Sequence, residues 1–159
     1  MTVLSQANEH LKYFGEQLVP MIGYCQPEIL TLTDESVEIK IPLNKETKNH
    51  LHSMYFGALA VGADAAGGFL AISKSEQMGK KISLAFKAVK AEFLARPEAD
   101  VVFVCNDGKL IDKMLAETME TGERINQAVR ITALCPSLNG DQPMAEFELT
   151  LSVKVVGNT

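Results

Sequence analysis

This 159-residue sequence has few cysteines and no block of basic residues, and each absence narrows the possible functions. There are only three cysteines, Cys25, Cys105 and Cys135, and they form no CxxC pair. We therefore expect reduced structural thiols rather than disulfides, metal ligands or redox sites. The 15 Lys and Arg residues are scattered along a chain of net charge −5, which argues against nucleic acid as a partner.

The sequence also shows no targeting signal, internal repeat or low-complexity tract. Its first ten residues, MTVLSQANEH, carry an acidic residue early and lack a basic region followed by an apolar run. This start predicts no secretory signal and favours a cytoplasmic protein. With 47% hydrophobic residues, the chain can build one real core, so we expect one domain over residues 1–159.

The first forty residues predict a helix followed by a hairpin. Apolar residues recur every three to four positions over residues 3–19, which is typical of an amphipathic helix ending before Pro20. We expect a linker containing Pro20, Gly23 and Pro27 to follow. Apolar and polar residues then alternate over 29–33 and 37–41, on either side of the turn at 34–36, as in a β-hairpin.

The stretch from Tyr55 to Ser73, YFGALAVGADAAGGFLAIS, is apolar on every face of a helix. Its length approaches that of a membrane span, but four glycines and a central Asp64 argue against one. We expect instead a helix that is buried on all sides within a soluble protein.

The rest of the chain is dominated by long strand-like stretches. These cover residues 82–94, 100–105, 124–135 and 144–156, and the last two alternate clearly around the turn Asn139-Gly140-Asp141. Between the second and third of these stretches, apolar residues at helical spacing over 109–121 predict a short insertion helix. This order predicts an α+β fold in which a long antiparallel sheet wraps around one central apolar helix.

Asp64 is the only charged residue between His52 and Lys74, and its burial requires a reason. Capping or a structural ion pair is one explanation, although no Lys or Arg lies three or four positions away. A functional explanation includes Gly57, which lies two turns earlier on the same side of the helix, where N–H groups lack intrahelical partners. Thioester hydrolysis needs such an oxyanion donor together with a carboxylate that acts as nucleophile or general base.

One helix cannot place both groups on the same carbonyl. Seven residues at 1.5 Å rise separate Gly57 and Asp64 by roughly 10 Å along the helix axis. If two antiparallel helices meet at a two-fold axis, Gly57 of one subunit faces Asp64 of the other. We therefore expect a homodimer with two sites at the subunit interface, and the sequence leaves open whether dimers pair into a homotetramer.

The stretch from Asn49 to Asp64, NHLHSMYFGALAVGAD, resembles the helix signature of the hotdog-fold thioesterase superfamily, in its phenylacetyl-CoA thioesterase-like family. In that family an Asn precedes a His-Gly-Gly triplet and an Asp lies near the middle of the helix. The resemblance implies that Asp64 is the catalytic carboxylate, that the Gly57 N–H contacts the thioester oxygen, and that Asn49 helps to order the site. Tyr55 stands where the family has His, and Phe56 stands where it has the first Gly.

The resulting hypothesis is an acyl-CoA thioesterase that needs no cofactor beyond its coenzyme A thioester substrate, with Asp64, Gly57, Asn49 and Tyr55 at its site. The departures at Tyr55 and Phe56 keep a non-catalytic acyl-CoA or acyl-chain binding protein as the alternative. A dehydratase of the same fold ranks last, because His50 and His52 do not lie at the start of the helix. Their spacing and the lack of further ligands also argue against a metal site. Neither the acyl group nor the choice between coenzyme A and acyl-carrier protein follows from the sequence.

Overall fold

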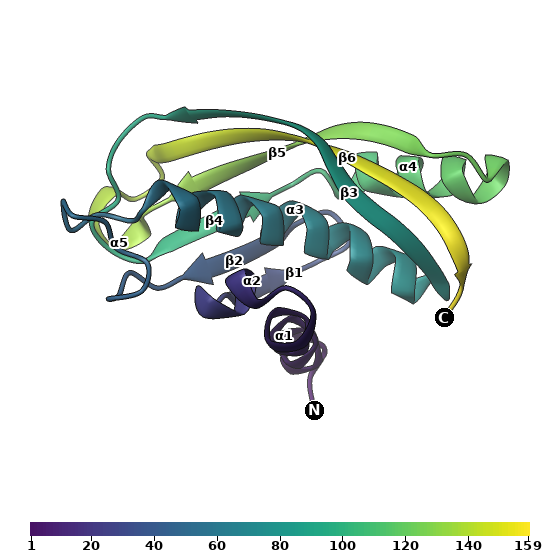
Figure 1. The fold of residues 1–159 in the computed structure, drawn as a ribbon, viewed down its shortest axis with the longest axis horizontal. Helices are drawn as coiled ribbons and strands as arrows, with labels where there is room; N and C mark the ends of the chain where they lie inside the picture. Colours follow the sequence, from purple (N-terminus) through teal and green to yellow (C-terminus); the bar gives the residue numbers. More distant parts are fainter.

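A computed structural model of residues 1–159 contains one antiparallel sheet of six strands in the order β1-β2-β4-β5-β6-β3. Figure 1 shows this sheet curling around the long helix α3, with the remaining helices at the periphery. The predicted architecture of a sheet wrapped around one central helix is therefore confirmed. The strands are β1 (Glu28–Leu32), β2 (Val37–Ile41), β3 (Lys80–Phe93), β4 (Val101–Cys105), β5 (Ile125–Leu134) and β6 (Pro143–Asn158). The helices are α1 (Val3–Tyr13), α2 (Pro20–Tyr24), α3 (Phe56–Gln77), α4 (Gly108–Thr121) and α5 (Pro136–Asn139).

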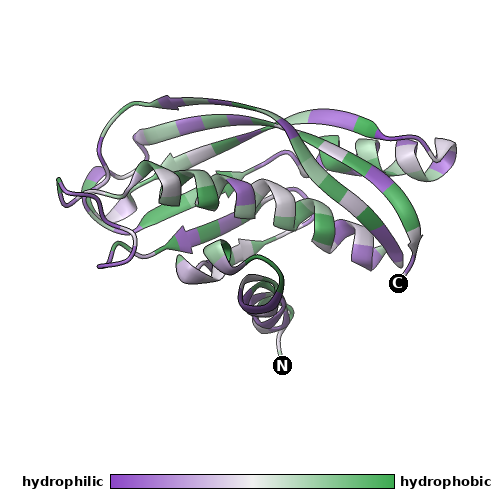
Figure 2. Cartoon of the chain, in the orientation of Figure 1, coloured by the Kyte–Doolittle hydropathy of each residue, from purple (hydrophilic) through white to green (hydrophobic).

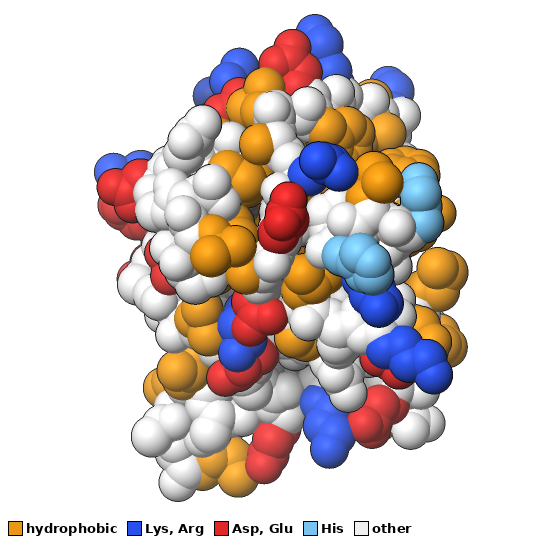
Figure 3. Space-filling view, turned by 90° about the vertical axis from the view of Figure 1, so that its left-hand side faces the viewer, with side chains coloured by type: hydrophobic (Ala, Val, Ile, Leu, Met, Phe, Trp, Pro, Cys, Tyr) orange, Lys and Arg blue, Asp and Glu red, His pale blue; other side chains and the backbone are white.

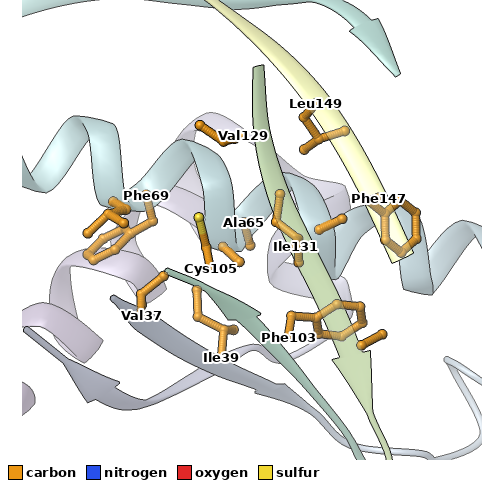
Figure 4. Packing of buried hydrophobic residues seen from close by; sticks show 14 of the residues in the cluster. Val37, Ile39, Ala65, Phe69, Phe103, Cys105, Val129, Ile131, Phe147 and Leu149 are labelled. Atoms are coloured by element: carbon orange, nitrogen blue, oxygen red, sulfur yellow. The ribbon is translucent and has the colours of Figure 1, made fainter. Parts of the chain in front are cut away.

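The core lies between α3 and the inner face of the sheet. Ala65 and Phe69 of α3 pack among buried side chains of several strands, including Ile39, Phe103 and Ile131 (Figure 4). Figure 2 shows that α3 is apolar along most of its length. The helix has the length and composition of a membrane span, but the sheet of its own chain covers most of it. It is therefore the core helix of a soluble domain, and it extends four residues beyond the predicted end.

The prediction that α3 is buried on all sides is wrong for the chain on its own. Ala60 is exposed, and Gly57, Val61 and Asp64 are only partly buried. These residues recur every three to four positions, so they form one stripe along the helix. The sheet curls around α3 but does not close over this stripe.

The N-terminal region is more helical than predicted. After α1 the chain makes a π-helical segment, η1 (Phe14–Leu18), and the expected linker at 20–27 begins with the short helix α2. Pro20 starts this helix because proline suits the first helical position, where no N–H acceptor is needed. A β-carbon on Gly15 would collide with the backbone of Gly23, so these two glycines allow η1 and α2 to touch.

Two polar contacts fix the outer helices to α3. The His10 Nδ1 lies 3.2 Å from the Glu76 carboxylate, which ties α1 to the last turn of α3. The buried Lys74 Nζ lies 2.9 Å from Asp112 Oδ1, which ties α3 to the insertion helix α4. The predicted insertion helix is confirmed, starting one residue earlier than expected.

The two edges of the sheet differ. At the β1 edge, the Asn8 side chain donates to the Ile29 carbonyl (3.0 Å) and accepts from the Ile29 N–H (2.7 Å), so α1 occupies hydrogen-bonding positions that another strand would use. At the β3 edge, 13 of the 14 strand residues pair with β6, and the other side of the strand has no partner. Long unpaired edges are uncommon in stable monomers because they recruit other strands.

Candidate active site

The loop before α3 is ordered by Asn49. Its side-chain oxygen accepts hydrogen bonds from the N–H of Leu51 (2.9 Å) and from the N–H (3.1 Å) and hydroxyl (3.2 Å) of Ser53. The Tyr55 N–H then donates to the Thr47 carbonyl at 2.8 Å. Asn49 thus shapes the entry to α3 through its oxygen.

The first turn of α3 carries free backbone donors. Leu59 is the first residue whose N–H finds an acceptor, the Tyr55 carbonyl at 3.1 Å, and no side chain caps the helix. The N–H groups of Phe56, Gly57 and Ala58 have no acceptor within the chain. Unpaired N–H groups at the positive end of a 22-residue helix are suited to hold a negatively charged oxygen.

Tyr55 and Phe56 surround this helix end. The Tyr55 ring lies against Gly57 so closely that a β-carbon on Gly57 would collide with it. Phe56 continues an edge-to-face row of rings through Phe93 (centroids 6.1 Å apart) to Phe147 (5.9 Å). Both Tyr55 and Phe56 are exposed in the single chain. Figure 3 faces this end of the molecule and shows several hydrophobic patches between charged and histidine side chains.

Asp64 lies two turns further along α3, in an apolar environment. Burial raises the pKa of Asp64 from 3.8 to about 6, and neither a hydrogen bond nor a nearby charge counteracts this effect. The capping and ion-pair explanations are therefore not realised within the chain. A half-buried carboxylate without a partner is a strong base for its residue type, and groups of this kind concentrate at functional sites.

A small cavity of about 30 Å³ opens beside Asp64. Leu11, Phe14 and Ile22 line it from the N-terminal helical region, and Leu84 lines it from β3. The other lining residues come from α3 and are Ala65, Gly68, Phe69 and Ile72. Sequence reasoning did not place the N-terminal region at the site, although Leu11 and Phe14 belong to the apolar face of the predicted helix.

The structure places Asn49, Tyr55 and Gly57 together at the start of α3 but does not bring Asp64 to them within one chain. Gly57 and Asp64 share the uncovered stripe of α3, separated by about 10 Å along the axis. The cysteines offer no alternative nucleophile, because all three are buried. Burial raises the pKa of the Cys105 thiol to about 11, so it is not a thiolate near neutral pH.

Comparison with known families identifies the chain. A family model described as "Domain of unknown function (DUF4442)" matches residues 7–150. The chain belongs to this family. No curated protein matches the DUF4442 chain significantly in sequence.

Solved structures similar to this DUF4442 protein have the hotdog fold. A candidate thioesterase from Shewanella oneidensis superposes with a TM-score of 0.79 at 13% identity, covering 94% of this chain and 99% of that one. A protein of unknown function from Chlorobaculum tepidum superposes with a TM-score of 0.81 at 14% identity, covering 95% of this chain and 96% of that one. Thioesterase HI1161 from Haemophilus influenzae gives 0.68 at 14% identity, covering 98% and 92%. At such identities the similarity establishes the fold, and the hotdog prediction is confirmed.

Proposed function

We propose that this DUF4442 protein is an acyl-CoA thioesterase that hydrolyses its substrate to a free acid and coenzyme A without a further cofactor. The observation that carries the proposal is Asp64, a carboxylate with no partner beside an apolar cavity. It shares one stripe of α3 with a helix start whose N–H groups are free. The neighbours described as thioesterases lend support through their shared fold.

In the proposed reaction, the thioester carbonyl oxygen accepts hydrogen bonds from the N-terminal N–H groups of α3, with Gly57 as the main donor. Asp64 either removes a proton from water, whose oxygen attacks the carbonyl carbon, or attacks that carbon itself to give an anhydride that water then hydrolyses. In either route the C–S bond breaks, and the coenzyme A thiolate takes up the proton that the attacking water loses. The donors act on the negative charge that develops on the oxygen in the transition state.

The proposed site requires a homodimer, because Gly57 and Asp64 of one chain lie too far apart. The open β3 edge supports this assembly. Phe86, Val89 and Phe93 pair with residues of β6 that face the core, yet they are 38%, 67% and 51% exposed. Core-facing apolar side chains with this exposure support the proposal that a partner surface covers them.

A second copy of the chain fits this surface. Pairing two β3 strands about a two-fold axis would satisfy about 48 Å of edge, given 14 residues at about 3.4 Å each. The same operation would bring the uncovered stripes of two α3 helices toward each other, with the start of one helix near Asp64 of the other. The partner's residues would also cover the exposed apolar side chains of β3.

A non-catalytic acyl-CoA or acyl-chain binding protein is the alternative. It is favoured by the Tyr55 ring, which packs directly against Gly57 at the proposed position of the thioester carbonyl. In this alternative the apolar cavity and the helix start bind the acyl-thioester, and the bulk around Gly57 prevents turnover.

A thiol-release assay over acyl-CoAs of different chain length separates the two functions. We expect wild-type protein to release coenzyme A and Asp64→Asn to retain acyl-CoA binding while turning over at least about 10²-fold more slowly. Asp112→Asn is the matched control, since it makes the same change in a carboxylate that pairs with Lys74 away from the site. Tight binding without thiol release by the wild type would establish the binding protein, and equal rates for wild type and Asp64→Asn would refute the assigned carboxylate.

A further inference from the structure

The cavity beside Asp64 extends along one side of α3. Asp64, Gly68 and Ile72 follow one another at four-residue spacing on α3, so the cavity runs from the carboxylate toward the end of the helix, away from Gly57. Beyond Asp64 its lining is apolar. A group that extends from a carbonyl at Asp64 into this space would contact only carbon atoms, which suits a hydrocarbon and not the polar coenzyme A moiety.

The volume of the cavity limits what it holds. At about 30 Å³ the cavity has room for a group of only a few carbon atoms. The Phe14 ring and the Ile22 side chain close the cavity from the N-terminal region. A long acyl chain would have to displace them.

The wall that Phe14 and Ile22 form on one side of the cavity is held in place by the packing of the N-terminal region. Phe14 begins η1, where the Val19 N–H donates to the Phe14 carbonyl at 2.9 Å, five residues back. Such π-helical turns are rare and occur frequently at functional sites. Gly15, the next residue, packs directly on Gly23 of α2, so the wall cannot retreat toward α2.

We propose that the DUF4442 protein is selective for short aliphatic acyl groups, from acetyl to butyryl, and that Gly68 and Phe14 set this limit. The inference rests on the proposed function, because it assumes that the acyl carbonyl is held at Asp64. Gly68 lines the cavity from α3, one turn after Asp64, and Phe14 lines it from the N-terminal region.

Gly68 offers a sharp test because it has a matched neighbour. A β-carbon on Gly68 would lie 3.4 Å from Phe86, 3.5 Å from Asp64 Oδ1 and 3.7 Å from Leu84. A β-carbon on Gly67 would lie 3.4 to 3.7 Å from Ile131, Val129 and Leu149 of the sheet. Both alanines fit at ordinary contact distances and favour the helix, but only the one at position 68 occupies the cavity.

The experiment compares kcat/KM for acetyl-, butyryl- and octanoyl-CoA in the wild type, Gly68→Ala, Gly67→Ala and Phe14→Ala. We expect the wild type to prefer acetyl and butyryl over octanoyl. Gly68→Ala should lower the butyryl-to-acetyl ratio about 10-fold, the typical effect of one methyl group in an apolar pocket. Gly67→Ala should leave that ratio unchanged, and Phe14→Ala should raise the octanoyl-to-acetyl ratio about 10-fold.

Two outcomes overturn the inference while leaving the thioesterase proposal intact. One is a wild type that hydrolyses octanoyl-CoA best, and the other is an identical change of ratio in Gly68→Ala and Gly67→Ala. If no thiol is released from any substrate, the thioesterase proposal fails instead. The pocket is then tested by binding of the thioethers S-ethyl-, S-butyl- and S-octyl-CoA. The same order of affinities in the same variants would support it, and no dependence on chain length would refute it.

Discussion

Replacing Asp64 by asparagine should stabilise the protein above pH 6 while it removes the proposed catalytic group. Burial raises the pKa of Asp64 from 3.8 to about 6, so the folded state holds its proton more tightly than the unfolded state. Between these two values the folded state binds more protons, and stability falls as pH rises through this window. The loss levels off above about pH 6.5, where Asp64 is ionised in both states. An asparagine side chain cannot ionise, so the variant avoids this loss.

The size of this stability difference follows from the difference of about two units between the pKa of Asp64 in the folded state and in the unfolded state. At about 1.4 kcal/mol per unit, ionised Asp64 costs the chain about 3 kcal/mol of unfolding free energy. Partner N–H groups near Asp64 in the proposed dimer would reduce this cost, so we expect about 1–3 kcal/mol. For a chain of this size, each kcal/mol corresponds to about 2–4 °C in melting temperature.

The assay is urea unfolding of wild type and Asp64→Asn from pH 4 to pH 8 at one protein concentration, because association links stability to concentration. The difference between the two proteins cancels the titration of the other carboxylates. We expect near equality at pH 4, a growing advantage of the variant up to about pH 6.5, and a constant advantage above. A difference that does not change with pH would refute the conclusion that Asp64 is desolvated.

Further predictions concern activity and assembly. Because the proposed mechanism uses ionised Asp64, thiol release measured against pH should fall about tenfold per unit below pH 6 and level off above it. Tyr55→Phe should lower kcat/KM by at most about tenfold, since one hydrogen bond contributes about 0.5–1.5 kcal/mol; a loss equal to that of Asp64→Asn would assign Tyr55 a larger role. Val89→Lys should sediment as an inactive monomer, whereas Ala88→Lys, its neighbour on the outer face of β3, should remain an active dimer. A dimeric Val89→Lys protein would place the subunit interface elsewhere.

The patterns that the sequence carries most clearly are local, and these were predicted correctly. The all-apolar stretch around Asp64 forms the central helix because no other position in the fold could bury it. The alternating stretches form β5 and β6, which pair along ten residues as expected. Both predictions rest on the periodicity of neighbouring side chains.

The parts that could not be predicted depend on contacts between distant segments. Pro20, Gly23 and Pro27 together predict a linker where the structure has the short helix α2, because Gly23 serves to let the backbone of Gly15 approach. Phe14 and Ile22 line the Asp64 cavity although more than forty residues separate them from Asp64 in the sequence. The uncovered stripe of α3 follows from the width of the sheet, which periodicity does not encode.

The hydrogen bonds between Asn8 and Ile29 have a consequence for how far assembly can proceed. A sheet with two open edges can add chains at both ends and grow into a fibre. Here the side chain of Asn8 terminates the β1 edge, which is also short and irregular at Ile29 and Thr31. Growth through sheet edges can therefore occur only at β3, and it stops after one addition, because each chain that joins presents a terminated edge to the solution.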